Sequence, residues 1–251
     1  MIAAVQPLQS AFEPLASSGE TDVSALDEIG ALQRETLGER VTGELRCLLV
    51  AGRLAPGEKL SLRRVAEALG VSMMPVREAV SRLAADGALE VLPGRAVRVP
   101  VLSLDQFREL TRLRLVVEGF AAEEAARNAT AEDTARIATY DAAFRKAASA
   151  DPPDSAGAVA ANRDLHFALY EAAGMPSLIE MIERLWLKAG PILNLDMRDE
   201  PRRLQGGSAM QAHGRLLAAV RRQDTAAARA ALEDDITAAA AHIEDTGQLR
   251  A

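Results

Sequence analysis

The chain has 251 residues, a formal net charge of −7, a single cysteine and 49% apolar residues. This length supplies the core of one large or two ordinary domains, and the lone Cys47 excludes a disulfide framework within the chain. No apolar run approaches the length that spans a membrane, and the first residues lack the basic start of a secretory signal. The composition therefore indicates a cytoplasmic globular protein without a membrane partner.

The first two segments of the chain differ in their periodicity. Residues 1–34 mix proline, serine, glycine and acidic residues, which predicts a flexible extension with one short helix near Ser24–Leu32. From about Glu35 to Ala51 the apolar residues recur at helical spacing, and Gly52 is suited to end that helix. The folded part of the chain is therefore expected to begin at residue 35.

Residues 61–87 predict two short helices joined by a tight turn. Ser61 is a suitable N-cap for the first helix, and Gly70 is the residue type that ends a helix in the left-handed conformation. Ser72 is placed to cap the second helix, and Pro75 falls in its first turn, where a missing N–H is tolerated. Two helices across a glycine-containing turn are typical of a DNA-reading helix-turn-helix.

Two short β-prone runs follow the second helix. Residues 88–92 and 96–100 flank Pro93-Gly94-Arg95, which predicts a hairpin. Residues 37–100 hold ten basic and seven acidic side chains, although the whole chain is negative. A basic head on an acidic body is the asymmetry expected when one part of a protein faces phosphate.

These segments together resemble the winged-helix domain of the GntR family of bacterial transcription regulators. The resemblance rests on GRLAPGEKL (52–60), SLRRVAEALGVSMMPVREAVSRLAADGALEV (61–91) and PGRAVRV (93–99). It implies a winged helix-turn-helix over residues 35–100 that binds a double-stranded DNA operator. The DNA-binding residues that it implies are Arg63, Ser72, Met73, Met74, Arg77 and Arg95. For each arginine, a surface role in an ion pair or a turn remains the alternative.

Met73 and Met74 depart from the family pattern, which commonly has Arg and then Thr or Ser after the capping serine. Arginine can read guanine with two hydrogen bonds, whereas methionine offers only apolar contact, for instance to a thymine methyl. We therefore expect operator bases opposite Met73 that differ from the common family core. The alternative is that both methionines only fill space.

From Ser103 onward the pattern is helical, and Ser103 with Gln106 forms a capping box. The predicted helices span about 104–128, 130–148, 158–173, 177–193, 208–222 and 225–245, with a polar stretch at 196–207. Short connections between helices indicate an antiparallel bundle. The expected fold is mainly α: a winged helix-turn-helix followed by an all-α bundle over residues 101–251.

This body resembles the FCD ligand-sensing domain of the FadR-type branch of GntR regulators. The resemblance rests on LRLVVEGFAAEEAA (113–126), NRDLHFALYEAAGMPSL (162–178) and AHGRLLAAVRRQDTAAARAALEDDI (212–236). In metal-binding members, one Asp and three His hold the ion, and these positions fall here on Asn162, His166, His213 and Asp235. The resemblance thus implies one divalent transition metal, such as zinc, nickel, manganese or iron.

Helix geometry groups the same four residues independently. Asn162 and His166 are one turn apart, and His213 and Asp235 lie about equally far from the turn between the last two helices. Two imidazoles with carboxylate and amide oxygens form a plausible shell for these metals. The alternative is a pair of core histidines hydrogen-bonded in a polar cavity, with Trp186 and Tyr170 as core or cavity wall.

For an effector, Arg114 matches a cavity-facing arginine of the family, and Arg163 is a second candidate for binding a small carboxylate. An ion pair of Arg114 with Glu118 on a solvated face is the alternative. The resulting hypothesis is a homodimeric, ligand-responsive transcription regulator, a repressor released by a small organic acid. The rivals are an effector-independent activator or architectural dimer, and a metal-dependent enzyme fused to a DNA-binding head; we expect no enzymatic activity.

Overall fold

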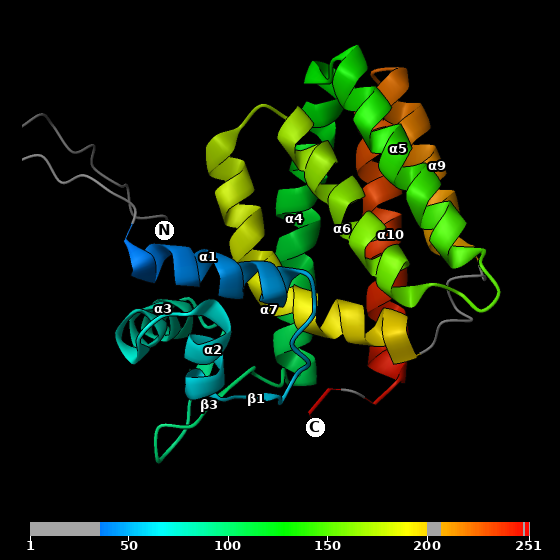
Figure 1. Ribbon diagram of the computed structural model, residues 1–251. Helices are drawn as coiled ribbons and strands as arrows, with labels where there is room; N and C mark the ends of the chain where they lie inside the picture. Colours follow the sequence, from blue (N-terminus) through cyan, green and yellow to red (C-terminus); the bar gives the residue numbers. More distant parts are fainter. Residues whose placement is uncertain (1–35, 200–206, 248, 251) are drawn as a thin grey trace, which may run out of the picture. The chain divides into compact units, whose positions relative to one another are not determined.

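The computed structural model describes residues 36–199, 207–247, 249 and 250 (Figure 1). The predicted extension at 1–34, with its short helix, lies outside these residues. The elements of the head are α1 (Leu37–Val50), β1 (Lys59–Leu60), α2 (Leu62–Leu69), α3 (Met73–Ala85), β2 (Glu90–Val91) and β3 (Val97–Arg98). The helix-turn-helix and the hairpin therefore form where the sequence predicts them.

The three short strands form one antiparallel sheet in the order β1-β3-β2. Arg98 on the central strand β3 faces Lys59 on one side and Glu90 on the other. Strand β1 was not predicted, because two residues after a Pro-Gly turn carry no readable alternation. Strand β1 pairs the segment after α1 with β3 of the hairpin, so β3 has a hydrogen-bonded neighbour on each side. The hairpin β2–β3 is called the wing below.

The helices of the head begin and end as their caps dictate. The Thr36 side chain accepts a hydrogen bond from the Glu39 amide, and the Glu39 side chain accepts one from the Thr36 amide. Ser61 caps α2, and Gly70 ends it with φ +64°. Ser72 occupies the N-cap position of α3, but its side chain makes no cap hydrogen bond.

The wing turn requires two left-handed residues. The Arg95 amide donates to the Leu92 carbonyl at 3.0 Å, and Gly94 and Arg95 have φ +83° and +66°. The second value costs a non-glycine residue about 1–2 kcal/mol. Arg95 is thereby presented at the exposed tip of the hairpin.

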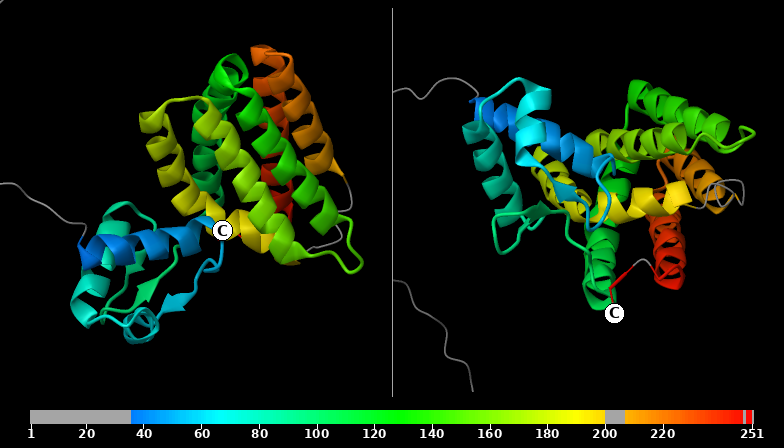
Figure 2. Two further views of the ribbon diagram at one scale, coloured as in Figure 1. Left: turned by 45° about the horizontal axis from the view of Figure 1, so that its top comes forward. Right: turned by 60° about the horizontal axis from the view of Figure 1, so that its bottom comes forward.

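The body consists of helices, as predicted, and Figure 2 shows how they lie side by side. Their bounds are α4 (Leu104–Asn128), α5 (Ala131–Ala148), α6 (Ser155–Ala172), α7 (Pro176–Asp199), α9 (Ser208–Arg221) and α10 (Thr225–Asp245). Alanines fill much of the main core, together with larger side chains such as Leu165, Ile182 and Trp186. Small residues at these positions let the helices approach closely. Among the described residues, no helix combines the length and apolar character needed to cross a membrane.

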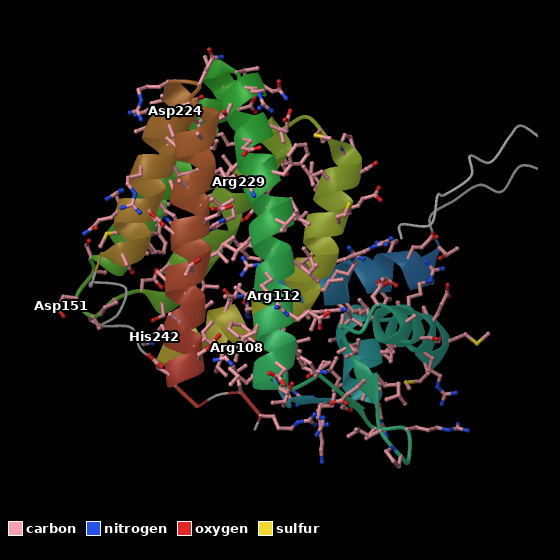
Figure 3. All side chains as sticks on the ribbon, turned by 180° about the vertical axis from the view of Figure 1, so that it is seen from behind. Arg108, Arg112, Asp151, Asp224, Arg229 and His242 are labelled. Carbon is pink, nitrogen blue, oxygen red and sulfur yellow. The ribbon has the colours of Figure 1, made fainter. Side chains whose placement is uncertain are left out.

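The first and last helices of the body run beside each other. The predicted capping box of Ser103 with Gln106 starts α4, and Asp224 caps α10 by accepting from the Ala227 amide. Ion pairs of Arg108 with Glu244 and of Arg229 with Glu123 join the two helices (Figure 3). Residues at opposite ends of the body sequence therefore form one wall of the bundle.

Helix α7 is longer than predicted, since it continues through the polar residues up to Asp199 with Pro191 inside it. It packs against α1 of the head. The Asn194 side chain donates to the Gly190 and Val50 carbonyls at 2.7 and 3.3 Å. A Cβ placed on Gly190 would lie 2.7 Å from the Leu49 carbonyl oxygen. Glycine is therefore required where the two helices meet.

Gly190→Ala should destabilise the protein by about 1–3 kcal/mol, because the new methyl group meets backbone atoms of α1 that cannot move aside easily. Gly43→Ala is the matched control: this glycine also lies within a helix, but nothing stands within 4 Å of its added Cβ. That substitution should be neutral or stabilising by up to about 1 kcal/mol. Denaturant unfolding measures both, and equal effects would contradict the close contact.

Candidate functional site

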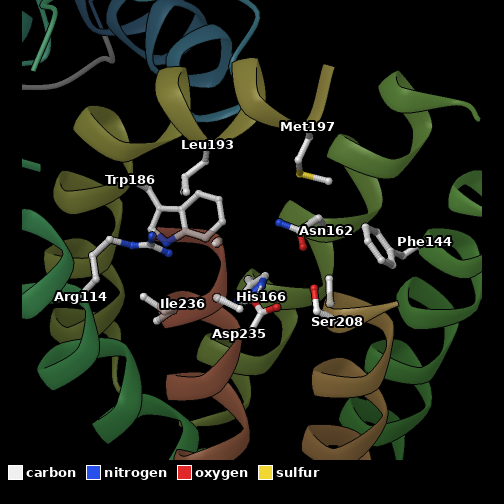
Figure 4. A pocket seen from close by; sticks show the side chains of 13 residues that line it. Arg114, Phe144, Asn162, His166, Trp186, Leu193, Met197, Ser208, Asp235 and Ile236 are labelled. Carbon is white, nitrogen blue, oxygen red and sulfur yellow. Dashed lines mark ion pairs between the residues drawn. The ribbon is translucent and has the colours of Figure 1, made fainter. Parts of the chain in front are cut away.

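Helices α4, α5, α6, α7, α9 and α10 surround a partly polar cavity in the body (Figure 4). Its lining residues are Arg114, Phe144, Asn162, His166, Trp186, Leu193, Met197, Ser208, Ala209, Asp235, Ile236, Ala238 and Ala239. Figure 4 shows Arg114 and Trp186 on one side and Asn162 with Phe144 on the other. Apolar walls with a few convergent polar groups are typical of a small-molecule site.

Three of the four residues predicted as metal ligands come together: His166 and Asp235 line this cavity, and His213 lies beside them. His166 Nε2 lies 3.2 Å from Asp235 Oδ2, and His213 Nε2 lies 3.9 Å from the same oxygen. One donor atom from each residue falls within 4.8 Å of the others. Asn162 lines the same cavity one turn before His166 on α6. The antiparallel course of α9 and α10 brings His213 level with Asp235, as their spacing from the intervening turn predicts.

The donor set fits a divalent transition metal. His213 is 1% exposed, and neither of its ring nitrogens has a hydrogen-bond partner within the described part of the chain. Buried polar atoms in proteins are nearly always satisfied, so an orphaned imidazole beside a carboxylate indicates a missing partner. Two imidazoles and one carboxylate are also ligands that zinc and its neighbours accept.

Burial and charge act in opposite directions on the titrating groups of this cluster. Burial lowers the pKa of His213 to about 4, although the negative charge of Asp235 opposes the shift. Burial alone would raise the pKa of the Asp235 carboxyl, but hydrogen bonding to His166 and the nearby positive charges outweigh it and lower that pKa. At neutral pH the site therefore holds a neutral His213 beside a negative Asp235.

Arg114 lies in the cavity wall, but its guanidinium is already engaged. It is 5% exposed, and its Nε and Nη2 donate to the two carboxylate oxygens of Glu118 at 2.6 and 3.1 Å. The guanidinium carbon also stands 5.3 Å from the centre of the Trp186 ring. The pair with Glu118 therefore exists, although on a buried face and not on the solvated one considered from the sequence.

Arg163 does not take part in the cavity. Its guanidinium pairs with Asp164 at 2.5 Å, its side chain is 32% exposed, and it is not among the residues that line the cavity. Residue 163 is rotated away from the cavity-facing positions 162 and 166 on α6, so Arg163 lies outside this cavity and its role as an effector ligand stays a prediction.

Sequence reasoning gave Tyr170 only a place in the core or the cavity wall. The Tyr170 hydroxyl lies 3.0 Å from His166 Nδ1 and donates a hydrogen bond to Glu118. Burial and the charge of Glu118 raise the pKa of Tyr170 well above its ordinary value. The one sequence signal for the contact between Tyr170 and His166 is their spacing of four residues, which puts both side chains on one helix face.

In the head, the exposed face of α3 carries three of the predicted DNA-binding residues. Ser72, Met74 and Arg77 are exposed, and Met74 is 79% exposed. Met73 is only half-exposed, because it packs against the core of the head. Met73 therefore fills space in the head, which is the alternative considered above for both methionines. Met74 is the methionine that faces outward.

The two remaining DNA-binding candidates lie on other elements. Arg95 is exposed at the tip of the wing. The Arg63 side chain is 86% exposed on α2 and pairs with Glu67 at 2.9 Å. An exposed pair of this kind contributes little to stability, so Arg63 can exchange Glu67 for a phosphate at small cost.

The lowered pKa of His213 predicts a defined loss of stability in acid. The unfolded chain takes up this proton below about pH 6.5, whereas the folded protein resists it down to about pH 4. The contribution is therefore complete above the ordinary pKa and is lost as the pH falls through this window. In metal-free protein the free energy of unfolding should drop by about 2 kcal/mol between pH 7.5 and 5.

His213→Gln cannot take up the proton and should lose this part of the pH dependence, measured by denaturant unfolding with a chelator present. The wild-type protein, measured under the same conditions, is the reference. The same slope in both proteins would contradict a neutral, buried His213.

Comparison with known proteins accounts for both parts of the chain. Residues 37–99 match the family described as bacterial regulatory proteins, gntR family, and residues 109–238 match the FCD domain. The HTH-type transcriptional regulator McbR of Escherichia coli (strain K12) is 35% identical over 165 residues, which cover 66% of this chain and 74% of McbR. The structure of E. coli McbR/YncC covers 85% of this chain and 99% of its own, with a TM-score of 0.77 and 31% identity.

A further relative carries a more specific name. The "Probable D-xylose utilization operon transcriptional repressor" of Paenarthrobacter nicotinovorans is 29% identical over 170 residues, which cover 68% of this chain and 74% of that protein. The family models and the likeness to McbR agree with the winged head and the helical body described above. The chain belongs to the GntR family of bacterial transcription regulators and carries the helical FCD domain behind its winged helix-turn-helix.

Proposed function

We propose that this regulator is a repressor that binds its operator as a homodimer and releases it when a small carboxylate occupies the FCD cavity. The chain is divided in this proposal into a DNA-binding head at 35–100 and an effector-binding body at 101–251. It acts in the cytoplasm on double-stranded DNA and has no enzymatic activity. The name of the Paenarthrobacter relative supports repression over activation.

The observation that carries the proposal is the position of α7 between cavity and head. Trp186 and Leu193 on this helix line the cavity, while Leu187 belongs to the apolar core of the head. Gly190 and Asn194 contact the end of α1, as described above. A ligand that moves the cavity wall therefore moves a helix on which the head is packed, and two arrangements with different ligand affinity suffice for regulation.

The charge of the cavity favours a bound cation. Arg114 and Glu118 neutralise each other through two hydrogen bonds, and His213 is neutral at pH 7 because its pKa lies at about 4. Asp235, with a side chain that is 14% exposed, is then a largely enclosed negative charge that a closer cation would stabilise. A divalent metal held by His166, His213 and Asp235, with the Asn162 amide oxygen as a further donor, would supply it.

The same balance indicates the class of effector. Because Nε and Nη2 of Arg114 already donate to Glu118, only its remaining nitrogen, Nη1, is left to bind an incoming anion. A divalent ion, in contrast, would leave the site with a net positive charge that attracts a carboxylate. The effector is thus expected to bind at the metal, with Arg114 and Trp186 shaping the adjoining wall.

An apolar strip on α4 supports the homodimer. Leu113, Val116 and Phe120 are 49%, 62% and 39% exposed and recur at helical spacing on one side of α4. A contiguous apolar face of this kind is unfavourable in water and is typical of a protein–protein interface. A second copy of the chain covers it in our proposal, and the two heads would then read the half-sites of an imperfect palindrome.

Selection from random DNA tests the reading head. The wild-type protein should recover an imperfect palindrome without the family's usual guanine opposite the start of α3, since neither Met73, at the position of the family's arginine, nor the exposed Met74 can donate a hydrogen bond to a base. Met74→Arg should shift the preference towards guanine at that position by about 1–3 kcal/mol. Arg77→Ala should weaken binding to all sequences alike, because a phosphate contact carries no sequence information.

Arg221→Ala, which removes an exposed arginine of the body, is the matched control and should bind the selected DNA like the wild type. Failure of the wild-type protein to enrich any sequence would contradict a DNA-binding regulator. Enrichment of the usual guanine by the wild type would contradict only the role given to Met73 and Met74.

A further inference from the structure

Beyond the residues that line the metal site, three side chains behind His166 form a continuous hydrogen-bonded chain. Arg114 binds both carboxylate oxygens of Glu118, the Tyr170 hydroxyl contacts Glu118, and Tyr170 stands 3.0 Å from His166 Nδ1. All four are buried, with exposures between 0% and 5%. Polar groups so far from water are expected to have fixed donors and acceptors.

The direction of each hydrogen bond in this series follows from its first member, the Arg114 guanidinium, which can only donate. The two hydrogen bonds from Arg114 hold Glu118 as a carboxylate, which can only accept. The Tyr170 hydroxyl has one proton and must donate it to Glu118, so its oxygen is left to accept from His166. His166 Nδ1 must therefore carry a proton.

A proton on Nδ1 fixes the role of the other ring nitrogen. In the neutral ring, Nε2 then has a lone pair, and this atom faces Asp235 Oδ2 at 3.2 Å. Two lone pairs pointing at one another repel unless a proton or a metal cation stands between them, and His213 Nε2 reaches towards the same oxygen. The ring is thus oriented so that Nε2 is the atom that a metal ion would bind in place of a proton.

We propose that Tyr170 and Glu118 are positioning residues that hold His166 in its Nδ1-protonated form and so make Nε2 its metal-binding atom. This inference rests on the proposed metal site. Partners of this kind behind a ligating histidine typically raise metal affinity, and their loss costs about 10–100-fold. Glu118 and Arg114 lie on α4, Tyr170 and His166 on α6, and Asp235 on α10. These contacts therefore also fix the three helices relative to the site.

Zinc affinity in Tyr170→Phe provides the test, measured by competition with a chromophoric chelator on protein first freed of metal. This variant removes one hydroxyl and keeps the ring, so its affinity for zinc should fall by about 10–100-fold at unchanged stoichiometry. Tyr140→Phe is the matched control: Tyr140 is the other tyrosine of the chain, packs against the same core and has no part in the hydrogen bonds that link Arg114 to His166. It should bind zinc like the wild type.

Nitrogen NMR of the histidine rings gives a second readout that a loss of folding cannot imitate. The chain has three histidines, so a His213→Gln and a His242→Gln variant assign the spectrum. In metal-free wild-type protein His166 Nδ1 should carry a proton, and in Tyr170→Phe the two tautomers should mix. The wild-type spectrum alone shows whether His166 Nδ1 carries a proton, so this readout tests the positioning role even if Tyr170→Phe folds poorly.

The outcomes separate the inference from the proposed function. Wild-type zinc affinity in Tyr170→Phe, or an unprotonated His166 Nδ1 in the wild type, would overturn the positioning role and leave the metal site standing. A wild-type protein that binds no zinc would overturn the metal site and the positioning role with it.

Discussion

Burial of charge in the middle of the body is the constraint on which the rest of this molecule depends. Glu118 is fully buried with Arg114 as its partner, and Asp235 is held between two imidazoles. A buried ion pair contributes little net stability, but leaving one of its charges alone costs several kcal/mol. The helices that carry these groups must therefore meet in one arrangement, and that arrangement forms the cavity.

The same constraint explains how the cavity can influence the head. Trp186 stands over the guanidinium of Arg114 and beside His166, so one face of α7 is packed against the charged cluster. The other face meets α1, with Gly190 permitting backbone contact and Arg46 pairing with Glu183 at 2.9 Å. Closely packed helices shift between discrete arrangements and do not deform continuously, which is the behaviour that a switch requires.

Much of the fold could be predicted because local signals and hydrophobic period agree. The capping box of Ser103 marks the start of α4, Gly70 ends α2, and the helical period locates the remaining helices. Two elements were missed for physical reasons. Strand β1 has only two residues, too few for a pattern, and the end of α7 has a polar sequence, which resembles a loop.

The residues that meet at the candidate site were predictable from the sequence, but their hydrogen-bond and ion-pair partners were not. Helical spacing brings His166, His213 and Asp235 together, and the structure agrees. What spacing cannot show is which partner a long side chain takes: Arg114 turns to Glu118, Arg163 turns to Asp164, and Met73 turns inward. The hydroxyl of Tyr170 was hidden for the same reason, because its two partners come from a helix 52 residues away and from its own.

If occupancy of the cavity controls the head, a change in operator affinity measures that control most directly. Zinc-loaded protein and the selected operator are titrated by fluorescence anisotropy in the presence of short-chain mono- and dicarboxylates. At least one carboxylate should weaken operator binding by about tenfold or more in the wild type. It should have no effect on the His166→Ala/His213→Ala double variant, which lacks both of the proposed imidazole ligands. An equal loss in both proteins, or no loss with any carboxylate, would contradict the account.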